Sequence, residues 1–353
     1  MPCVDATDKN RFLAYGEQLH SRFVVLERIG SGGFGQIFKA TDVLRNASVA
    51  IKVEDVFGEQ SEHDPRRLVI ERKVLAEVRG QRHFPLVFAS GNSEKGRPFI
   101  VMELLGPNLA ALRKRLPSQC FSHLTLFRVA QQVVIALEVL HKLQYIHRDI
   151  KPTNCCIGAS GVARKTIYLI DFSNSFVKML NRKDQWIAPR TDAGFCGTIR
   201  YASARAMRRK ECGAVDDLVS WMYAVVEMGT GQLPWKREDK MDTILRMKRE
   251  IKSDDLCKEL PAPMTECLDY LRSLHYDDAV KYDRIQELLR RSLPRGFSYD
   301  DPYDWETGGT NRANEVNRMK KPKAKVKKRQ APVEQAKKSG STLRLATAED
   351  DSV

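Results

Sequence analysis

One ten-residue stretch carries the clearest chemical signal in the chain: Tyr145-Ile146-His147-Arg148-Asp149-Ile150-Lys151-Pro152-Thr153-Asn154. It places an aspartate, a lysine and an asparagine close enough in sequence to share one tight loop. A match this short is a hypothesis that needs support from its structural context. The segments on either side therefore decide whether the loop is functional.

The three side chains together suit the transfer of a phosphoryl group. That reaction needs a carboxylate to accept the proton of the substrate hydroxyl, a cation near the moving phosphate, and an oxygen ligand for Mg²⁺. Asp149, Lys151 and Asn154 would supply these in that order. The sequence thus predicts two catalytic residues and one metal ligand in this loop.

A glycine-rich segment lies upstream, between two stretches with the alternating pattern of strands. Residues 23–29 and 36–40 flank Gly30-Ser31-Gly32-Gly33-Phe34-Gly35. Glycines allow a tight turn whose backbone N–H groups can approach phosphate oxygens. A lone G-x-G-x-x-G motif also fits a dinucleotide-binding fold, but that fold needs a helix directly after the glycines. The strand pattern that follows favours a phosphate-binding hairpin instead.

The next predicted strand, residues 48–53, contains the sequence V-A-I-K and a single lysine, Lys52. A lysine at a strand end commonly packs its stem on apolar surface and reaches water with its ammonium. After a glycine loop, the same pattern favours a ligand of the α- and β-phosphates. That role requires an acidic partner on the next predicted helix, residues 67–75. Glu71 is favoured over Glu77, and a solvated helix face is the alternative interpretation of either.

Three more segments follow along the chain. Residues 97–107 run from an apolar strand into a Gly-Pro breaker, and residues 124–141 have the spacing of an amphipathic helix. Residues 166–170 form a short apolar strand before Asp171-Phe172-Ser173. A carboxylate here predicts the second metal ligand. This triplet is usually Asp-Phe-Gly, so Ser173 replaces a glycine. Loss of that glycine affects the mobility of the segment more than its chemistry.

Taken together, residues 23–294 resemble a eukaryotic protein kinase domain, with a lysine two positions after Asp149 as in the serine/threonine class. Glu103-Leu104-Leu105-Gly106-Pro107-Asn108-Leu109 and Gly197-Thr198-Ile199-Arg200-Tyr201-Ala202-Ser203 are similar to the casein kinase 1 group. Gly231-Gln232-Leu233-Pro234-Trp235 is most similar to the tau-tubulin kinase branch. The resemblance implies an α+β fold of two lobes, a small β-rich N-lobe and a larger helical C-lobe.

The same resemblance divides the chain into three parts. We expect residues 1–20 to form a loosely attached extension, residues 21–297 the kinase domain, and residues 298–353 a basic, disordered tail. The N-lobe would extend to about residue 102, the hinge would occupy residues 103–106, and the C-lobe would end near residue 297.

The resemblance also implies that ATP and Mg²⁺ bind between the lobes, with Asn154 and Asp171 as the metal ligands. The residues that it places around ATP are Ile29, Gly30, Ser31, Gly32, Gly33, Phe34, Gly35, Ile37, Ala50, Lys52, Met102, Glu103, Leu105, Cys156 and Ile170. Among these, Cys156 is expected to act as a small buried hydrophobe. The catalytic set that it implies is Asp149, Lys151, Lys52, Glu71 and Thr198, with Asp217 as the anchor of the loop backbone.

Casein kinase 1 relatives often favour acidic or already phosphorylated substrates, and Arg200 stands at the position where that group binds an anion. Arg190 and the basic cluster Lys236, Arg237 and Lys240 could add to this site, and a basic rim would raise the local concentration of acidic peptides. Ordinary solvated charges are an equally good interpretation of the cluster. The expected partners are proteins with Ser or Thr acceptors that are acidic, phospho-primed or cytoskeletal.

Composition agrees with a protein of the cytoplasm or nucleus. The chain has 353 residues, of which 42% are hydrophobic and 29% charged, enough for one large bilobed core or two modest ones. No N-terminal run resembles a signal peptide, and the apolar residues 221–226 are too few to cross a bilayer. The eight cysteines contain no C-x-x-C pair, which predicts reduced thiols and no structural metal. We expect a monomer that does not bind membranes.

The positive charge is concentrated at the C-terminus. Residues 311–353 hold twelve basic and five acidic residues, so they carry half of the net charge of +14. The run from Arg318 to Arg329 fits a nuclear localisation signal, a nucleic-acid patch or a contact for acidic microtubule surfaces. A solubilising tail explains it equally well, and we expect nucleic acid to bind through this tail or not at all.

Three classes of function therefore remain open at this stage. The first is an active serine/threonine kinase, which the intact Lys52, Glu71, Asp149, Asn154 and Asp171 favour. The second is a pseudokinase scaffold, for which the serine at position 173 is the only sequence feature. The third is a cytoskeletal or polyanion-binding protein dominated by its basic tail.

Deletion of the residues after Asn311 separates the third class from the first. We expect the shortened chain to phosphorylate a short peptide at the full-length rate but to lose its retention on a polyanion, because the deleted segment carries half of the net charge. Peptide phosphorylation and salt-dependent retention on polyglutamate measure the two properties. Loss of the peptide activity would instead make the tail part of the catalytic unit.

Overall fold

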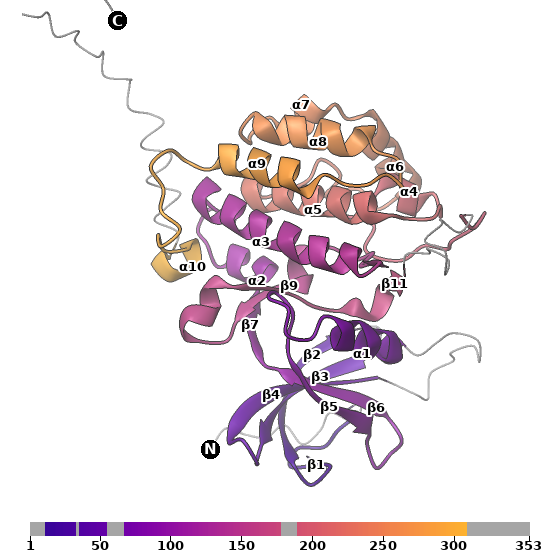
Figure 1. The fold of residues 1–353 in the computed structure, drawn as a ribbon, viewed down its shortest axis with the longest axis vertical. Coiled ribbons are helices and arrows are strands. Elements are labelled where there is room, and N and C mark those ends of the chain that lie inside the picture. The colour runs from indigo at the N-terminus through magenta and orange to yellow at the C-terminus, as the bar shows by residue number, and fades with distance from the viewer. Residues whose placement is uncertain (1–10, 33–34, 55–66, 178–188, 309–353) are drawn as a thin grey trace, which may run out of the picture.

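The computed structural model describes residues 11–32, 35–54, 67–177 and 189–308. A β-sheet with one helix forms the smaller lobe, and a bundle of helices forms the larger one (Figure 1). This is the two-lobed arrangement that the resemblance implies.

The N-lobe is built on one antiparallel sheet with the strand order β1-β2-β3-β4-β6-β5. Its strands are β1 (Gln18–Leu19), β2 (Phe23–Gly32), β3 (Gly35–Asp42), β4 (Ala47–Val53), β5 (Val87–Asn92) and β6 (Pro98–Glu103). Buried residues alternate with partly exposed ones along β3, as expected for a sheet with one face on a core. Phe38, Ile51 and Val101 belong to that core. The helix α1 (Arg67–Glu77) packs against β5 and β6.

Residues 11–19 are part of the packed N-lobe, which corrects the prediction of a loose extension over residues 1–20. Leu13 and Leu19 are 0% and 2% exposed and join the core under the sheet. Their burial was not predicted because two apolar residues in a polar segment show no helix or strand periodicity. Residues 1–10 lie outside the described residues.

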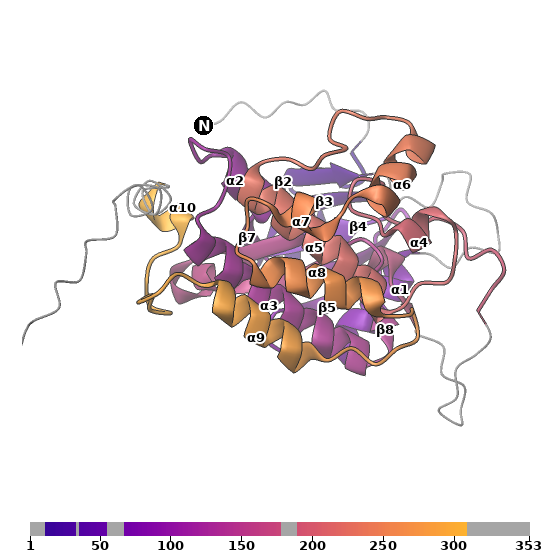
Figure 2. The ribbon, with the colours of Figure 1, turned by 90° about the horizontal axis from the view of Figure 1, so that it is seen from above.

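The C-lobe is mainly helical, and helices α3, α5, α8 and α9 lie side by side in it (Figure 2). Helix α3 packs against α5 and α9, and α8 packs against the same two helices. The helices of this lobe are α2 (Leu109–Lys114), α3 (His123–Lys142), α4 (Ala204–Met207), α5 (Ala214–Thr230), α6 (Met241–Glu250), α7 (Ser253–Cys257), α8 (Pro263–Ser273), α9 (Tyr282–Ser292) and α10 (Asp304–Thr307).

The C-lobe also contains short strands and 3₁₀ helices, and β7, β9 and β11 lie on its side toward the N-lobe (Figure 1). The strands form two small sheets, β10-β9-β7 and β11-β8. They are β7 (Leu105–Asn108), β8 (Tyr145–Ile146), β9 (Cys155–Gly158), β10 (Ile167–Leu169) and β11 (Phe176–Val177). The 3₁₀ turns are η1 (Pro152–Asn154), η2 (Gly161–Lys165) and η3 (Phe172–Asn174). The loop singled out from the sequence therefore begins in β8 and ends in η1.

Helix α3 is the core helix of the C-lobe. Ser122 caps its first turn by accepting a hydrogen bond from the backbone N–H of Thr125 at 3.2 Å. Among the described residues, α3 alone is long and apolar enough to cross a membrane, but 61% of its most apolar window is buried inside the fold. Its hydrophobic composition is explained by its contacts with α5 and α9.

The chain after α9 returns to the start of α3, so the predicted tail begins too early. Asp304 in α10 is fully buried and accepts hydrogen bonds from the backbone N–H and the hydroxyl of Ser122, at 2.7 and 2.8 Å. The Arg128 guanidinium lies 3.9 Å from the centroid of the Tyr303 ring. Residues 298–307 are thus attached to the C-lobe, and the strongly basic run lies outside the described residues.

Replacing Asp304 with alanine tests this attachment. We expect Asp304→Ala to lower the free energy of unfolding by about 2 to 4 kcal/mol, because two buried donors of Ser122 lose their acceptor. Thermal unfolding of the purified protein measures the effect. The exposed Asp300→Ala is the matched control and should change stability by less than about 0.5 kcal/mol. Equal melting temperatures of the two variants would contradict the proposed anchor.

Candidate active site

Three predicted site residues, Lys151, Thr198 and Asn154, hold Asp149 in place. Lys151 Nζ donates to Asp149 Oδ2 at 2.6 Å and to Thr198 Oγ1 at 3.0 Å, and the Thr198 hydroxyl donates to Asp149 Oδ1 at 2.8 Å. The side-chain nitrogen of Asn154 donates to the Asp149 backbone carbonyl at 2.9 Å. Asp149 is therefore fixed on both carboxylate oxygens, by a cation and by a hydroxyl from another segment.

The backbone of the loop is held by Asp217, a buried carboxylate in the first turn of α5. Its oxygens accept the backbone N–H groups of His147 at 2.7 Å and Arg148 at 2.8 Å. Arg148 has φ = 65°, a left-handed conformation that costs energy for a residue with a side chain. The two hydrogen bonds to Asp217 compensate for this strain, in the role that the resemblance implies for it.

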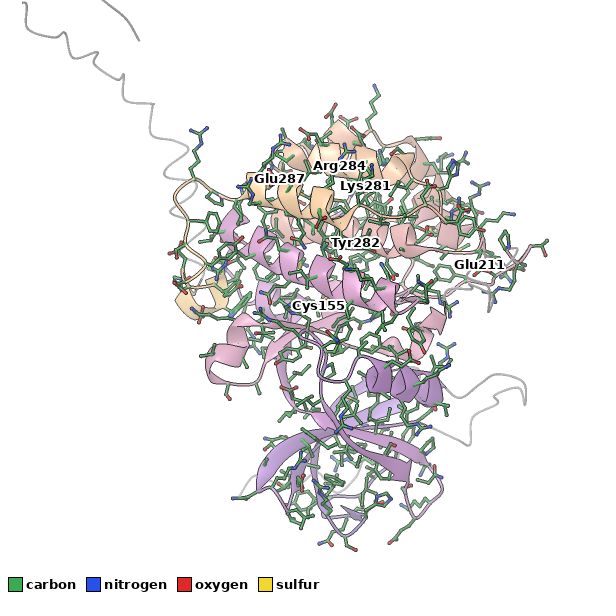
Figure 3. All side chains as sticks on the ribbon, in the orientation of Figure 1. Cys155, Glu211, Lys281, Tyr282, Arg284 and Glu287 are labelled. Atoms are coloured by element: carbon green, nitrogen blue, oxygen red, sulfur yellow. The ribbon has the colours of Figure 1, made fainter. Side chains whose placement is uncertain are left out.

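Asp217 has further partners that the sequence did not suggest. His141 Nε2 lies 2.8 Å from Asp217 Oδ2, and the opposite ring nitrogen lies 2.5 Å from the hydroxyl of Tyr282. Tyr282 is the first residue of α9 and lies over α3 (Figure 3). Burial opposes the charge on Asp217, but the hydrogen bond from His141 and the nearby imidazoles keep its pKa below the usual range. Helix α9 thereby contributes to the support of the catalytic loop.

The segment that carries Thr198 approaches the same loop closely. Gly197 has φ = 103°, and a Cβ atom added there would lie 2.4 Å from the carbonyl oxygen of Arg148. Any side chain at this position would force the two segments apart. The glycine is thus needed for the contact between Thr198 and Asp149.

The second predicted group joins the two lobes. Lys52 Nζ in β4 lies 2.5 Å from Glu71 Oε2 in α1 and 2.9 Å from Asp171 Oδ1. The structure places Glu71 beside the lysine, whereas Glu77 accepts a hydrogen bond from Tyr145 at 2.8 Å. Burial disfavours the charge on Lys52, but attraction to the two carboxylates outweighs it and raises the pKa of the lysine.

The carboxylate of Asp171 contacts Lys52 from the N-lobe and Ser173, which lies two positions later in the sequence. The hydroxyl of Ser173 donates to Asp171 Oδ1 at 2.7 Å, the same oxygen that Lys52 contacts. Burial opposes ionisation of Asp171, but the lysine and this hydroxyl lower its pKa well below the usual range. Asp171 is therefore a carboxylate at neutral pH, and the serine that departs from the usual triplet acts directly on it.

Asn154 and Asp171 fit the requirements of a divalent metal site. The backbone N–H of Ile170 donates to the Asn154 carbonyl at 3.0 Å, which holds the residue before Asp171 against the catalytic loop. The two side chains offer an amide oxygen and an ionised carboxylate, the hard ligands that Mg²⁺ prefers.

Most of the described residues predicted around ATP lie in β2, β3, β4, β6, β7 and β9, and Ile170 follows β10. Ala50 in β4 and Met102 in β6 are paired in the sheet. Ile29 in β2 is 48% exposed, a large apolar side chain that a bound base could cover. Gly35 also has a specific reason to be glycine, because an added Cβ would lie 2.2 Å from the carbonyl oxygen of Val53.

The other predicted ATP contacts are placed as follows. Gly30 pairs with Ile37 across the hairpin, and Ser31 and Gly32 continue the same ladder. Glu103 donates its backbone N–H to Leu86 at 2.8 Å, so this N–H is not open to a ligand. Leu105 starts β7, which pairs with the strand that contains Cys156. Burial raises the pKa of Cys156 to about 12, so it is a neutral thiol and an apolar surface. Gly33 and Phe34 lie outside the described residues.

The two arginines predicted to bind an anion have carboxylate partners. Arg200 lies 3.3 Å from Glu227 in α5. Arg190 binds Glu211 through two hydrogen bonds of 2.7 and 2.9 Å, at the edge of the helical lobe (Figure 3). Arg200 and Arg190 are thus paired with two different glutamates, and the structure does not bring the two arginines together as a single anion-binding site.

Acidic residues lie close to two members of the predicted basic cluster. Lys236 and Arg237 line a hollow in the surface of the C-lobe that contains Asp255 and Glu259 as well. Lys240 precedes α6 as its N-cap residue. The acidic neighbours favour the interpretation of ordinary solvated charges.

Comparison with known proteins identifies the family. A family model described as "Protein kinase domain" matches residues 23–291, so the chain belongs to the protein kinase family. A probable serine/threonine-protein kinase of Dictyostelium discoideum is 35% identical over 301 residues, which cover 84% of this chain and 59% of the relative. A putative casein kinase I of Caenorhabditis elegans is 33% identical over 307 residues, which cover 85% and 88%. Use of ATP with a divalent metal is general in this family.

Replacing Ser173 with glycine tests what its hydroxyl does to the metal site. We expect the Mg²⁺ concentration for half-maximal activity to fall roughly 2- to 10-fold, which corresponds to the ~0.5–1.5 kcal/mol of one side-chain hydrogen bond, because Asp171 Oδ1 loses a competing donor. Ser173→Ala should have the same effect without adding backbone freedom. The exposed Ser160→Gly is the control. A rise in the required Mg²⁺ for the glycine variant alone would show that flexibility, and not the hydrogen bond, dominates.

Proposed function

We propose that this protein is an active serine/threonine kinase that transfers the γ-phosphate of ATP to protein hydroxyls with the help of Mg²⁺. The observation that carries the proposal is the contact of Lys52 with both Glu71 and Asp171, at 2.5 and 2.9 Å. Protein kinases need this lysine-glutamate pair and the metal-binding aspartate in place at the same time. Here the chain itself assembles them.

Each residue of the site then has a chemical task. Asp149 accepts the proton of the substrate hydroxyl, and Lys151, which contacts it at 2.6 Å, faces the transferring phosphate. Asn154 and Asp171 hold Mg²⁺, which neutralises the charge that develops on the phosphate oxygens. Thr198 holds Asp149 from the opposite side and marks where the acceptor residue enters.

We further propose a place in the casein kinase 1 group, near the tau-tubulin kinase branch, with a preference for acidic or primed proteins. The hinge and the segment around Thr198 support the group, and the name of the nematode relative points the same way. An acidic substrate would have to compete with Glu227 for Arg200, which is 42% exposed at its side chain. We therefore expect the preference to be moderate. A monomer in the cytoplasm or nucleus remains part of this proposal.

A pseudokinase is the second candidate, since Ser173 departs from the usual glycine. The contacts argue against it, because the serine hydroxyl binds Asp171 and leaves the pair of Lys52 and Glu71 intact. The tail-dominated alternative rests on residues outside the described ones.

Phosphate transfer from labelled ATP with Mg²⁺ to casein and to a phospho-primed acidic peptide tests the proposal. We expect transfer by the wild type and loss of transfer in Asp171→Ala. Asp149→Asn should reduce kcat roughly 10²- to 10⁴-fold and leave the KM for ATP within about twofold, because it removes the proton acceptor without touching the nucleotide site. The exposed Asp242→Asn is the matched control.

Two outcomes would contradict the assignment. Full turnover by Asp149→Asn would exclude this residue as the base. Nucleotide binding without transfer in the wild type would favour the pseudokinase, and Ser173 would then be the first residue to revert to glycine.

A further inference from the structure

Lys248 in α6 is a buried lysine outside the residues that carry the proposed chemistry. It is 3% exposed, and its Nζ donates to the backbone carbonyl oxygens of Ile199 at 2.6 Å and Ala202 at 2.7 Å. Lysine is among the residues least often fully buried, because moving an ammonium group out of water is costly unless it finds partners. Its partners here are two carbonyls of the segment that follows Thr198.

Two aromatic rings complete the surroundings of this ammonium group. Nζ lies 5.1 Å from the ring centroids of both Tyr223 and Trp235. These rings meet edge to face at 4.9 Å, and the indole N–H of Trp235 donates to the carbonyl oxygen of Arg200 at 2.8 Å. Lys248 and Trp235 together bind three carbonyls within residues 199–202.

The partners explain how a lysine can remain in this position. Burial lowers the pKa of Lys248 to about 7, whereas carbonyl oxygens and aromatic faces favour the charged form. A neutral amine still has two N–H donors, so both hydrogen bonds can persist on either side of this pKa. We call the hydrogen bonds from Lys248 to the carbonyl oxygens of Ile199 and Ala202 the tether. Neither of these two hydrogen bonds involves a carboxylate that an acidic substrate could displace.

The tethered segment leads directly to the proposed base. The carbonyl oxygen of Thr198 accepts the backbone N–H groups of Tyr201 and Ala202, both at 2.9 Å, and so closes a turn. The side chain of Thr198 bonds to Asp149 and Lys151. A shift of this turn would therefore move one of the groups that hold Asp149, and would also reshape the surface where a substrate hydroxyl must arrive.

We propose that Lys248 is a positioning residue for the protein substrate, which fixes residues 198–202 so that the acceptor hydroxyl meets Asp149. The inference rests on the proposed kinase function. Trp235 has the same positioning role, through its hydrogen bond to the carbonyl oxygen of Arg200. Among the described residues, the contacts named above for Lys248 and Trp235 are with residues 199–202, with Tyr223 and with each other. We therefore expect their influence to fall on the protein substrate and not on ATP.

Lys248→Met tests this role, because methionine keeps an apolar stem under the rings and removes both hydrogen bonds. We expect the ratio kcat/KM for an acidic peptide to fall by about tenfold to a hundredfold, the scale of a misplacement of about 1 Å, with KM for ATP unchanged. Lys248→Arg should restore part of the loss, since a guanidinium can donate to two carbonyls and lie against aromatic rings. Arg249→Met, an exposed neighbour on the same helix, is the matched control.

A second measurement works without enzyme activity. The amides of Tyr201 and Ala202 are hydrogen-bonded, so their hydrogen exchange should be slow in the wild type and faster in Lys248→Met, while exchange in α3 stays the same. Anisotropy of a labelled acidic peptide, read with the same variants, reports binding to the segment. Melting temperature shows whether the variant is folded, and Trp235→Phe supplies a second test if Lys248→Met is not.

The outcomes separate the two proposals. Selective loss of peptide turnover with faster exchange in residues 198–202 supports the positioning role. Unchanged kinetics in a folded variant overturns it, even if exchange is faster, because the tether would then be structural only. If the wild type transfers no phosphate, the kinase proposal fails by itself, and weaker peptide binding in Lys248→Met still supports the tether whereas equal binding overturns it.

Discussion

One buried carboxylate determines the position of the catalytic loop. Asp217 binds two successive backbone N–H groups, one of them on Arg148, whose positive φ would be unfavourable without such support. Its own charge is sustained by His141, and His141 contacts Tyr282 at the start of α9. The loop therefore depends on three helices of the C-lobe, although its sequence suggests a short independent motif.

The residues of the candidate active site could be predicted for two reasons. Their motifs are short and local in the sequence, and a buried charged residue needs a partner of opposite charge. Lys52 closes an apolar strand after a glycine loop, and a buried ammonium needs an anion, so Glu71 on the next helix followed from the sequence. Asp149 and Asn154 were predicted because the reaction needs both within one loop. The two-lobed fold was predicted mainly because these motifs occur in the same order as in protein kinases. The periodicity of hydrophobic residues contributed less to that prediction.

The supporting residues His141, Tyr282, Ser122 and Asp304 were not predicted, because no motif marks them and their partners are far away in the sequence. His141 and Tyr282 are 141 positions apart, and Ser122 meets Asp304 across 182. Leu13 and Asp304 each extend the packed domain beyond the boundaries that composition suggested. A single buried residue in a polar segment gives no periodic signal, so only the packed structure reveals it.

The site is divided between parts that depend on the N-lobe and parts that do not. Asp149 is held by Lys151 and Thr198, and both its backbone anchor in α5 and the proposed tether in α6 belong to the C-lobe. Lys52 lies in the N-lobe and reaches Asp171, so this ion pair joins the two lobes. The hydroxyl of Ser173 adds a contact from the C-lobe to the same oxygen of Asp171. The predicted metal ligand is thus held from both lobes, whereas the side-chain contacts of Asp149 described above all come from the C-lobe.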